Sequence, residues 1–514
     1  MNSQNHETFD VVVVGGGGSG LAAAIEAARY GRSVVLLEKN PALGGTTVLS
    51  VGSVTSTCTS LQRASGIQDS PQAHFEDMGL LADNRGFVEK DNLELRRLLV
   101  EHSPDTVQWL TDMGVVFFGT LPEQPHRLPR MHTVLPHSRS YIYHLKKRAL
   151  QLGVDIRVDT RVLKLLRTGT AVTGVEAAAD GGASRSIGAS RGVILATGDY
   201  SSAREIKAQF MSAELANVGG INPSSTGDGQ RMVQEAGGEI VNGEIMLGPE
   251  IRFVAPPAKK FLEMVPPLKP IALAMRWSMK HLPAWLLRPF LMAFVTTTLA
   301  PSPNLFKKGA ILVNKEGRRF VDERKDPQLA TPGQPGGIAY ILMDDKIAGE
   351  FGAWPNFIST APGVAYAYLA DYRRNRKDIF AQAGSLAELA TKLGLPAGSL
   401  EATVAEHNRD LPEGLPKIDR VPYCVLGPVN SRIIFTDGGA RINSSFEVVD
   451  RGGRPIRGLY AAGSAGQGGV LLEGHGHHLG WAFTSGRLAG RSAALGGDEW
   501  TEAALAARRA ERQC

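Results

Sequence analysis

Apolar positions near the start of the chain follow two different periods. Phe9–Val14 is apolar and β-branched apart from Asp10, a glycine cluster follows, and alanine-rich helical periodicity then continues to Tyr30. Ser33–Leu37 has no solvent-facing alternation, which is typical of a strand inside a parallel sheet. The pattern predicts a right-handed strand–helix–strand unit.

The next part of the chain mixes helical and strand patterns. Residues 88–115 and 139–152 show amphipathic helical periodicity, and short strands are expected at Asp155–Val158 and Val172–Ala178. Gly192–Ala196 predicts another buried strand, which ends in Thr197-Gly198.

A change in amino-acid composition near residue 247 predicts an inserted domain. Prolines cluster there, apolar residues dominate to about 306, and a mixed α/β pattern continues to about 430. Afterwards we expect a hairpin at Gly438–Val449, a strand at Gly458–Ala462 and a helix from about Leu479 that packs small residues on the sheet. A chain of 514 residues exceeds the size of one compact core. We therefore predict a core in two parts, 1–246 and 431–514, interrupted by a second domain at 247–430.

The glycine cluster has the spacing of a dinucleotide-binding turn. Gly15, Gly17 and Gly20 form Gly-x-Gly-x-x-Gly between the first strand and the first helix. The first glycine permits the tight turn, the second lets backbone amides reach a pyrophosphate, and the third lets the helix pack closely on the strand. Glu38 ends the second strand, where its carboxylate can accept hydrogen bonds from a ribose diol. This unit would accept NAD as well as FAD.

Three separated segments resemble the FAD-contact segments of the fumarate reductase and succinate dehydrogenase flavoprotein family. They are residues 38–47 (Glu-Lys-Asn-Pro-Ala-Leu-Gly-Gly-Thr-Thr), the strand end Ala196-Thr197-Gly198, and residues 458–463 (Gly-Leu-Tyr-Ala-Ala-Gly). Residues 225–229, 311–314 and 319–320 agree with the same family. The resemblance covers nearly the whole chain. It implies an α/β fold with a Rossmann-like FAD-binding domain of glutathione reductase type and an inserted α+β cap domain.

The resemblance also implies which residues would contact the cofactor. The flavin would extend from the first strand–helix unit to a ring between core and cap, bound noncovalently. The residues carried over for this role are Gly15, Gly17, Gly18, Ser19, Gly20, Glu38, Lys39, Gly44, Gly45, Thr46, Thr47, Ser50, Gly52, Val162, Ala196, Thr197, Gly198, Gly227, Asp228, Gly463, Ser464, His478 and Leu479. His478 and Leu479 would begin the last helix, whose amides and dipole would face the flavin pyrimidine. Because no second nucleotide fingerprint is visible, we expect an external electron donor or acceptor.

Two positions depart from the fumarate reductases of this family. Phe435 replaces the histidine before Thr-x-Gly-Gly, and the arginine of the C-terminal loop falls near Glu473. Buried dicarboxylates require cationic donors, and only Arg324 and Lys325 remain as candidates. Residues 471–480 are instead similar in layout to the flavin-facing loop of the 3-ketosteroid dehydrogenases. In that branch hydride passes between a C–C bond beside a ketone and flavin N5, and a tyrosine and a glycine N–H polarise the ketone.

This layout gives the candidate catalytic residues. Gly476 retains the glycine, whereas Leu472 stands near the place of the tyrosine. Glu473 and His475 are candidates for proton transfer, and Tyr340 in the cap is a further donor. Three histidines within four residues, His475, His477 and His478, converge on one ion only with difficulty, so we expect no metal.

Residues 254–306 form a separate apolar segment. Trp277 and the apolar residues of 282–295 are interrupted by Lys280 and Arg288, and three prolines make the charge-free run after Arg288 unsuitable as a membrane-spanning helix. Three interpretations stay open: a peripheral membrane contact, a flap over an apolar substrate channel, and ordinary burial against the cap.

Charge and cysteine content indicate which partners and which cellular compartment to expect. The net charge of +5 is mild and scattered, so nucleic acid is not an expected partner. Three distant cysteines indicate neither a disulfide framework nor a zinc site, and the N-terminus has no signal-peptide pattern, so we expect a cytoplasmic protein.

The sequence thus predicts an FAD-dependent oxidoreductase of a C–C or C=C bond beside a carbonyl in a hydrophobic, steroid-like substrate. A fumarate reductase-like enzyme and a non-catalytic flavin protein are the alternatives.

Overall fold

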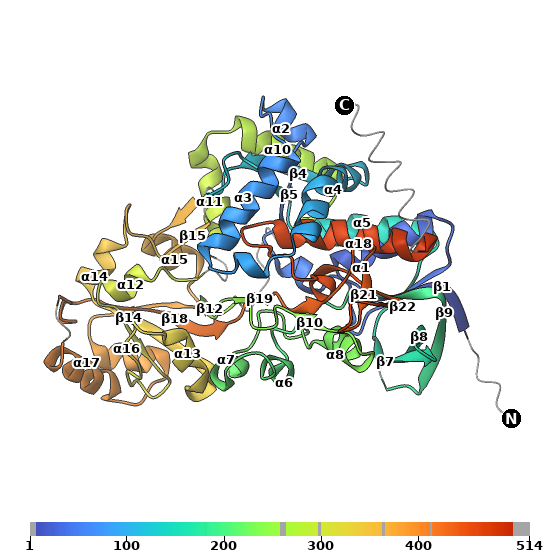
Figure 1. Cartoon of the computed structure of the whole chain (residues 1–514). Helices are drawn as coiled ribbons and strands as arrows, with labels where there is room; N and C mark the ends of the chain where they lie inside the picture. The colour runs from blue at the N-terminus through green and yellow to red at the C-terminus, as the bar shows by residue number, and fades with distance from the viewer. Residues whose placement is uncertain are drawn as a thin grey trace.

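Figure 1 shows the chain as a computed structural model. It folds around two main hydrophobic cores. The structure describes residues 7–179, 181–256, 264–296, 300–361, 365–411 and 414–496. The first core draws its side chains from both ends of the chain, and the second from residues 251–429. The domain boundaries at residues 246 and 430 stay a prediction.

An eight-stranded sheet forms the centre of the first unit. Its order is β21-β22-β9-β1-β2-β6, and β8 and β7 continue from β9. Strands β1, β2, β6, β9 and β22 run parallel, because β1 pairs in parallel with β2 and β9, β6 with β2, and β22 with β9. The bounds are β1 Glu7–Val14, β2 Val34–Leu37, β6 Asp155–Arg157, β7 Thr160–Thr168, β8 Ala171–Ala179, β9 Ser184–Leu195, β21 Glu447–Val449 and β22 Pro455–Ala461.

The predicted strands are all present in this sheet, but β7 was not predicted. The sequence of β7 mixes charged and apolar residues without a regular alternation, and most of its side chains are exposed or half-buried. It forms because it pairs antiparallel with β8, which in turn pairs with β9. A strand that depends on its neighbour in this way carries no continuous apolar run that would reveal it.

Two helices from opposite ends of the chain pack against each other. They are α1, Gly18–Arg29, and α18, His477–Leu495. A Cβ atom added at Gly486 would lie 2.3 Å from the Ser19 carbonyl oxygen, and one at Gly490 would lie 2.3 Å from that of Ala23. The small residues of α18 therefore permit close contact with α1, in addition to the predicted contact of this helix with the sheet at β9 and β22.

A helical layer with a small sheet covers this pair. It comprises α2 Ser60–Ala64, α3 Pro71–Asn84, α4 Leu93–Asp112 and α5 Arg139–Gln151, with the sheet β3-β5-β4 at Ser53–Thr55, Met131–Leu135 and Val116–Leu121. The helix predicted at 88–115 is interrupted, because the Asn92 side chain accepts a hydrogen bond from the Leu95 amide and caps α4 there. A 3₁₀ turn, Val88–Lys90, precedes the interruption.

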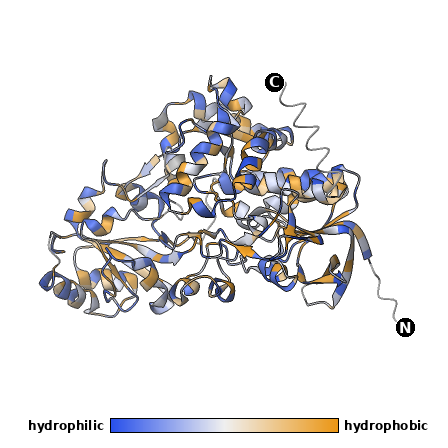
Figure 2. Ribbon diagram, in the orientation of Figure 1, coloured by the Kyte–Doolittle hydropathy of each residue, from blue (hydrophilic) through white to orange (hydrophobic). Residues whose placement is uncertain are grey.

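The second unit is built on a five-stranded antiparallel sheet. Its order is β12-β18-β14-β13, with β17 paired to β18. The bounds are β12 Glu250–Phe253, β13 Ile311–Val313, β14 Ile338–Met343, β17 Phe380–Ala383 and β18 Tyr423–Arg432. Helices α14 Asp345–Glu350, α15 Leu369–Asn375, α16 Leu386–Leu393 and α17 Ser399–Arg409 lie around it, together with the short hairpin β15 Ser359–Ala361 and β16 Ala365–Ala367. Figure 2 shows apolar strands inside and alternating polar and apolar positions on the outer helices.

Two short ladders connect the units. Strand β10 (Ile240–Val241) pairs with β20 (Gly439–Ala440), and β11 (Met246–Leu247) pairs with β19 (Phe435–Thr436). The predicted hairpin at 438–449 is reduced to a narrow turn closed by Ile442 and Val448, because β20 and β21 each pair with another strand. The short helices α6 Arg204–Lys207, α7 Ala213–Asn217 and α8 Asp228–Glu235 lie beside these ladders (Figure 1).

Candidate functional site

The predicted cofactor segments meet at one edge of the central sheet. Strands β1, β2, β9 and β22 run parallel and end next to Gly15, Glu38, Ala196 and Ala462. In open α/β sheets, ligands bind in the crevice outside the carboxyl ends of the parallel strands. The sheet thus brings together segments that are up to 447 residues apart, from Gly15 to Ala462.

The three glycines of the first turn have different tasks. A Cβ atom at Gly15, where φ is +107°, would lie 2.4 Å from the Ala196 carbonyl oxygen, and one at Gly20 would lie 1.9 Å from that of Gly15. These two glycines are required by the packing of the protein itself. A Cβ atom at Gly17 would meet only the Gly44 carbonyl oxygen, at 3.9 Å, so this backbone faces open space. Such space at the N-terminus of α1 fits a pyrophosphate.

The carboxylate of Glu38 lies beside this turn. Its Oε2 accepts a hydrogen bond from the Gly16 amide at 2.7 Å, and its Oε1 accepts from the Asn40 amide at 2.8 Å and the Asn40 side chain at 2.7 Å. A carboxylate offers about four acceptor positions, so this buried group keeps capacity for a ribose hydroxyl.

Lys39, Gly227 and Asp228 form a polar bridge next to Glu38. Lys39 Nζ donates to Asp228 Oδ2 at 2.8 Å, and Arg161 donates to Asp228 Oδ1 at 3.0 Å. Asp228 begins α8, and Gly227 precedes it with φ +66°. The buried Val162 follows Arg161 on β7. The bridge therefore holds together the elements around the expected adenosine end.

The segment from Gly44 to Gly52 crosses the same crevice. Thr47 Oγ1 accepts from the Gly18 amide at 3.2 Å, Thr46 accepts from Asn222 at 2.9 Å, and Ser50 donates to the Thr47 carbonyl oxygen at 2.7 Å. Gly44, Gly45 and Gly52 all have positive φ, and the Gly52 carbonyl oxygen accepts from the Tyr141 hydroxyl at 2.7 Å. These contacts thus fix the backbone and hydroxyl groups of residues 44–52 next to the glycine turn.

The strand ends of β9 and β22 complete the crevice. Thr197 Oγ1 is buried without a hydrogen-bond partner in the described structure, and Gly198 adopts φ +81° with open space beside it. The Gly463 amide donates to Ser485 Oγ at 2.8 Å, and the half-buried Ser464 follows it. An unpartnered buried hydroxyl, the open backbone at Gly17 and two helix N-termini together fit the predicted FAD.

Helix α18 starts at a fixed loop. Gly476 has φ +96°, and its carbonyl oxygen accepts from the amides of Thr55 and Gly480. A Cβ atom there would lie 2.6 Å from the Thr55 amide nitrogen, which excludes other residues. The first amides of α18, at His477, His478 and Leu479, have no intrahelical acceptor and are available to a ligand.

The side chains of Glu473 and His475 are held by partners that the sequence did not predict. Glu473 pairs with Arg85, which also donates to the Met246 carbonyl oxygen at 2.8 Å. Burial raises the pKa of Glu473, and Arg85 opposes this shift. His475 is half-exposed and pairs with Glu123, whose hydrogen bond raises the pKa of His475. The structure brings these two pairs to the same loop, but it directs the His475 ring to the surface.

A buried cluster of histidines supports the start of α18. His477 Nε2 lies 3.0 Å from His74 Nε2, while its Nδ1 bonds the Glu473 carbonyl oxygen. Burial lowers the pKa of His477 to about 3 and that of the adjacent His126 to about 4. The rings are therefore neutral at pH 7. Below them the fully buried Arg130 binds two aspartates, Asp69 through two hydrogen bonds of 2.7 Å and Asp77 through one of 2.5 Å.

His478 and Phe435 face each other at the junction of the two units. Their ring centroids are 3.7 Å apart, and Phe435 is paired with Leu247 across the β11–β19 ladder. Asp437, two residues further, is fully buried and lies 3.6 Å from His478. Asp437 occupies the variable position of the Thr-x-Gly-Gly motif, and no role was predicted for it. A carboxyl group between Thr436 and two glycines was the available sign.

Tyr340 lies elsewhere, at an irregularity of β14 in the cap sheet. Burial raises its pKa, and it sits on a different element from the Glu473–Gly476 loop. Its catalytic role stays a prediction.

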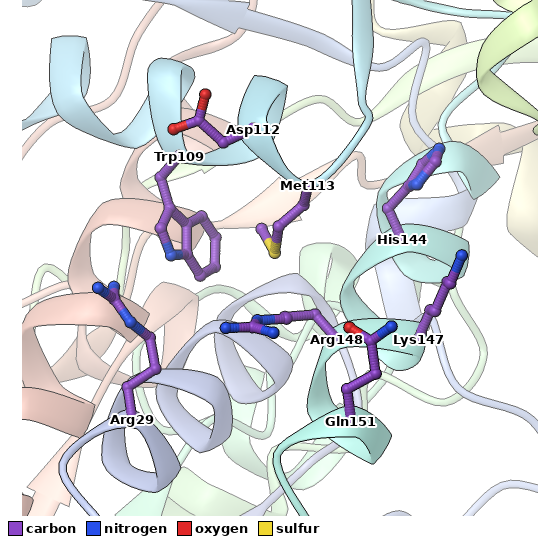
Figure 3. A pocket seen from close by; sticks show the side chains of 8 residues that line it. All are labelled: Arg29, Trp109, Asp112, Met113, His144, Lys147, Arg148 and Gln151. Carbon is purple, nitrogen blue, oxygen red and sulfur yellow. The ribbon is translucent and has the colours of Figure 1, made fainter.

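A surface cleft lies away from the crevice, at the opposite end of α1 (Figure 3). Helix α1 has 12 residues, so its two ends are separated by about 18 Å. Basic side chains at helix C-termini are an ordinary stabilising arrangement, and we assign the cleft no role. Its lining residues are Arg29, Trp109, Asp112, Met113, His144, Lys147, Arg148 and Gln151.

Candidate metal sites and candidate membrane-spanning helices are both absent from the described part of the chain. No group of three or more His, Cys, Asp or Glu side chains there could hold a metal ion. No described helix combines the length and apolar character needed to cross a membrane.

Comparisons with known proteins agree with this geometry. The family model described as FAD binding domain matches residues 10–253 and 288–472. The fumarate reductase (cytochrome) of Shewanella frigidimarina is 29% identical, over 96% of this chain and 78% of that protein. Among solved structures, the open conformation of a flavocytochrome c3 fumarate reductase gives a TM-score of 0.69 at 25% identity, covering 95% of this chain and 78% of that one. The 3-ketosteroid-Δ4-(5α)-dehydrogenase of Rhodococcus jostii RHA1, in complex with 4-androstene-3,17-dione, gives 0.57 at 25% identity, covering 96% and 98%.

The family match covers most of the chain and confirms three predictions. The fold is the Rossmann-like FAD-binding type with a cap, as in the fumarate reductase and ketosteroid dehydrogenase structures. FAD is the cofactor, and the protein is an enzyme. The chain belongs to the FAD binding domain family and is an FAD-dependent oxidoreductase.

Proposed function

We propose that this enzyme transfers hydride to or from a C–C bond beside a carbonyl group in a hydrophobic, steroid-like small molecule. As an FAD-dependent oxidoreductase, it relies on the bound flavin to supply the hydride exchange. The observation that carries the proposal is the contact between the rings of Phe435 and His478, whose centroids are 3.7 Å apart. Nearby, the charge of Arg85 is already neutralised by Glu473. This surface offers an aromatic ring and a neutral imidazole, which suit an uncharged ring system.

One of the two remaining cations predicted for a dicarboxylate is also engaged. Arg324 donates to Asp322 at 3.1 Å and is largely exposed, and it belongs to the cap segment after β13. A buried dianion needs several unneutralised donors, since leaving its charge unpaired costs several kcal/mol. These contacts support an uncharged carbonyl compound over fumarate, which stays the alternative because of the relative in Shewanella frigidimarina.

The proposed residue roles follow from the site. The Gly476 amide would polarise the substrate carbonyl, because Gly476 begins α18 and the positive end of the helix dipole lies there. The Glu473–Arg85 pair would exclude charged substrates. The FAD contacts carried over from the sequence, from Gly15 to Leu479, are part of this proposal. An external carrier would exchange electrons with the enzyme.

The first test is reoxidation of the reduced enzyme. The anaerobic holoenzyme is reduced with dithionite and mixed with 4-androstene-3,17-dione, 2-cyclohexen-1-one or fumarate, and the flavin absorbance near 450 nm is followed. We expect an enone to reoxidise the flavin at least about tenfold faster than fumarate, because Arg85 and Arg324 are already paired with carboxylates of the protein. Faster reoxidation by fumarate would support the alternative. No reoxidation by any of the three would favour a non-catalytic flavin protein.

We also propose that the enzyme works in the cytoplasm at the surface of an anionic membrane. The segment involved comprises α10, Lys269–His281, and α11, Ala284–Val295. Helix α10 contacts β4 and β5, while α11 contacts β15, β16 and α15 of the cap, so the pair spans both units. Residues 257–263 and 297–299 of the predicted 254–306 segment lie outside the described residues.

Exposure and charge support this docking surface. Trp277 is 60% exposed and Trp285 is 71% exposed, and further exposed apolar residues in the segment are Met264, Leu268, Leu273, Leu282 and Leu286. Burying one such side chain contributes about 1.5–3 kcal/mol, so their exposure is costly in water. Residues 264–306 contain no Asp or Glu, whereas Lys269, Lys280 and His281 are exposed. Basic residues around exposed tryptophans match the interface of an anionic bilayer.

Arg288, a basic residue within the predicted apolar segment, contacts the cap domain. Arg288 donates to Asp371 at 2.9 Å and lies over the Tyr368 ring, so it joins α11 to α15. Met292 and Val295 are buried in the cap core. The docking surface is therefore α10 with the first turn of α11, and the rest of α11 anchors it.

Liposome flotation tests this part of the proposal. We expect the protein to float with vesicles of phosphatidylcholine containing about one third phosphatidylserine, and to remain below with pure phosphatidylcholine. The double variant Lys269→Glu, Lys280→Glu should bind about tenfold more weakly or worse, since each basic residue contributes about 1 kcal/mol at such a surface. Lys346→Glu, an exposed charge reversal on α14, is the matched control. Equal binding by all three proteins would contradict docking through α10.

A further inference from the structure

Asp437 is a buried carboxyl group without a charged partner in bonding contact. Its Oδ1 accepts a hydrogen bond from Gln467 Nε2 at 2.7 Å, and its Oδ2 has no partner in the described structure. The Gln467 amide is oriented by a second donation, to the Val470 carbonyl oxygen at 2.9 Å. A buried carboxylate that accepts only one hydrogen bond is poorly stabilised, which favours the protonated acid.

His478 is the nearest titratable group. Its Nε2 lies 3.6 Å from Asp437 Oδ1 and is buried without a hydrogen-bond partner, while about a fifth of its side chain stays exposed. The ring also contacts Phe435. The Nε2 side of the imidazole thus faces a buried acid, and Nδ1 is the ring nitrogen left for a substrate. Catalytic hydrogen bonds are often long before a substrate is bound, so 3.6 Å is compatible with a working pair.

We propose that Asp437 and His478 form a carboxyl–imidazole pair that exchanges the proton of the C–C bond reaction, with His478 facing the substrate and Asp437 behind it. The inference rests on the proposed function for its substrate, but the pair itself is defined by contacts of this chain. It assigns proton transfer to His478, in place of the surface-directed His475 that the sequence favoured.

The proposed step balances without charging the imidazole. In the direction of reduction, the substrate C=C bond gains a hydride from the cofactor at one carbon and a proton at the other. The proton leaves His478 Nδ1 as the N–H bond breaks and a C–H bond forms, while the Asp437 O–H bond breaks and its proton moves to Nε2. The products are the saturated substrate, a neutral imidazole in the other tautomer and an Asp437 carboxylate, which regains a proton from water. Oxidation follows the reverse path.

The pKa shifts of Asp437 and His478 agree with proton transfer through an uncharged imidazole. Burial raises the pKa of Asp437 to about 7, opposed by the Gln467 hydrogen bond and raised further by Glu473. Burial lowers the pKa of His478 to about 3, and His477 adds to this shift. The other charged groups acting on the pair are Arg85, which lowers the Asp437 pKa, and Asp199, which raises it. Below pH 7 the proton therefore resides mainly on the acid, near pH 7 the protonated and ionised forms of Asp437 are about equally populated, and the ring is uncharged throughout.

The test that needs no substrate is NMR of the holoenzyme with ¹⁵N-labelled histidine. His478→Gln identifies the His478 resonances. We expect a neutral ring with the proton on Nδ1 below pH 7, and a change in the ¹⁵N shifts near pH 7 as Asp437 loses its proton. The change should vanish in Asp437→Asn. A ring that carries its proton on Nε2 at pH 6, or a step near pH 7 that persists in Asp437→Asn, would overturn the pair.

Kinetics test its catalytic role. With the enone that reoxidises the flavin, His478→Gln and Asp437→Asn should each lower the rate about 100-fold or more, within the usual range for general acid catalysis. His407→Gln, a buried histidine of α17 in the cap, is the matched control. Unchanged rates in both site variants would overturn the role. If no enone reacts even with the wild-type enzyme, the proposed function fails, and the NMR titration still decides whether the pair exists.

Thermal unfolding shows whether Asp437→Asn remains folded. A folded-state pKa raised to about 7 means that the folded protein holds an extra proton between about pH 4 and 7. Wild-type stability therefore falls as the pH rises through that window and levels off above it. The asparagine variant carries no such dependence, so its melting temperature should exceed that of the wild type at pH 8 and approach it near pH 4. A melting temperature of Asp437→Asn below that of the wild type at pH 8 would argue against the raised pKa of Asp437.

Discussion

Gly17→Val is expected to abolish FAD binding while leaving the fold intact. A Cβ atom at this position meets no protein atom closer than the Gly44 carbonyl oxygen at 3.9 Å, and the backbone φ of −77° suits valine. The added methyl groups would instead occupy the space through which backbone amides reach the pyrophosphate. Released flavin is measured by absorbance after denaturation, and the fold by circular dichroism.

The contrast with Gly20 makes this expectation specific. In Gly20→Ala the new Cβ would lie 1.9 Å from the Gly15 carbonyl oxygen, so this variant should lose folded protein as well as flavin. Gly349→Ala, where no atom lies within 4 Å, should retain both. Full occupancy of FAD in the Gly17→Val protein, or FMN in place of FAD in the wild type, would refute the assignment of the glycine turn.

Arg130→Met should destabilise the FAD-binding unit by about 3–5 kcal/mol, because it leaves buried carboxylates without their cation. Arg130 is fully buried, and its guanidinium donates to both oxygens of Asp69 and to Asp77. The loss corresponds to a decrease of roughly 10 °C in melting temperature for a unit of this size. Differential scanning calorimetry at pH 7 measures it.

The pH dependence separates lost charge pairing from lost packing. Arg130 and other hydrogen-bond donors outweigh burial and hold the pKa of Asp69 below its usual range. Wild-type stability from this pair is therefore present above about pH 4 and is lost as the pH falls through the lowered pKa. The difference in free energy of unfolding between the wild type and Arg130→Met should become smaller below pH 4. Arg127→Met removes a more exposed partner of the same Asp77 and should change stability little, and an equal loss in both variants would contradict the argument.

The comparison of sequence and structure is clearest at α18. The sequence located the helix and the preceding loop, because the small residues of 482–490 and the glycines of 474–476 are local features. It did not locate the partners of that loop. Arg85 and Glu123 come from segments about 390 and 350 residues away, and their pairing with Glu473 and His475 depends on how α3 and β4 lie against α18.

The sequence by itself determined the dinucleotide turn and the buried strands, since each rests on local spacing or on apolar runs that only buried strands tolerate. The choice of FAD over NAD came from the resemblance of three separated segments to one flavoprotein family. Tertiary structure alone decided which histidine faces the junction and which one faces solvent. His475, His477 and His478 are close in sequence, yet the first pairs with Glu123 at the surface, the second is buried on His74, and the third lies beside Asp437. The physical reason is that a turn into a helix distributes neighbouring side chains over different directions, and the elements packed against each direction set their burial, partners and pKa.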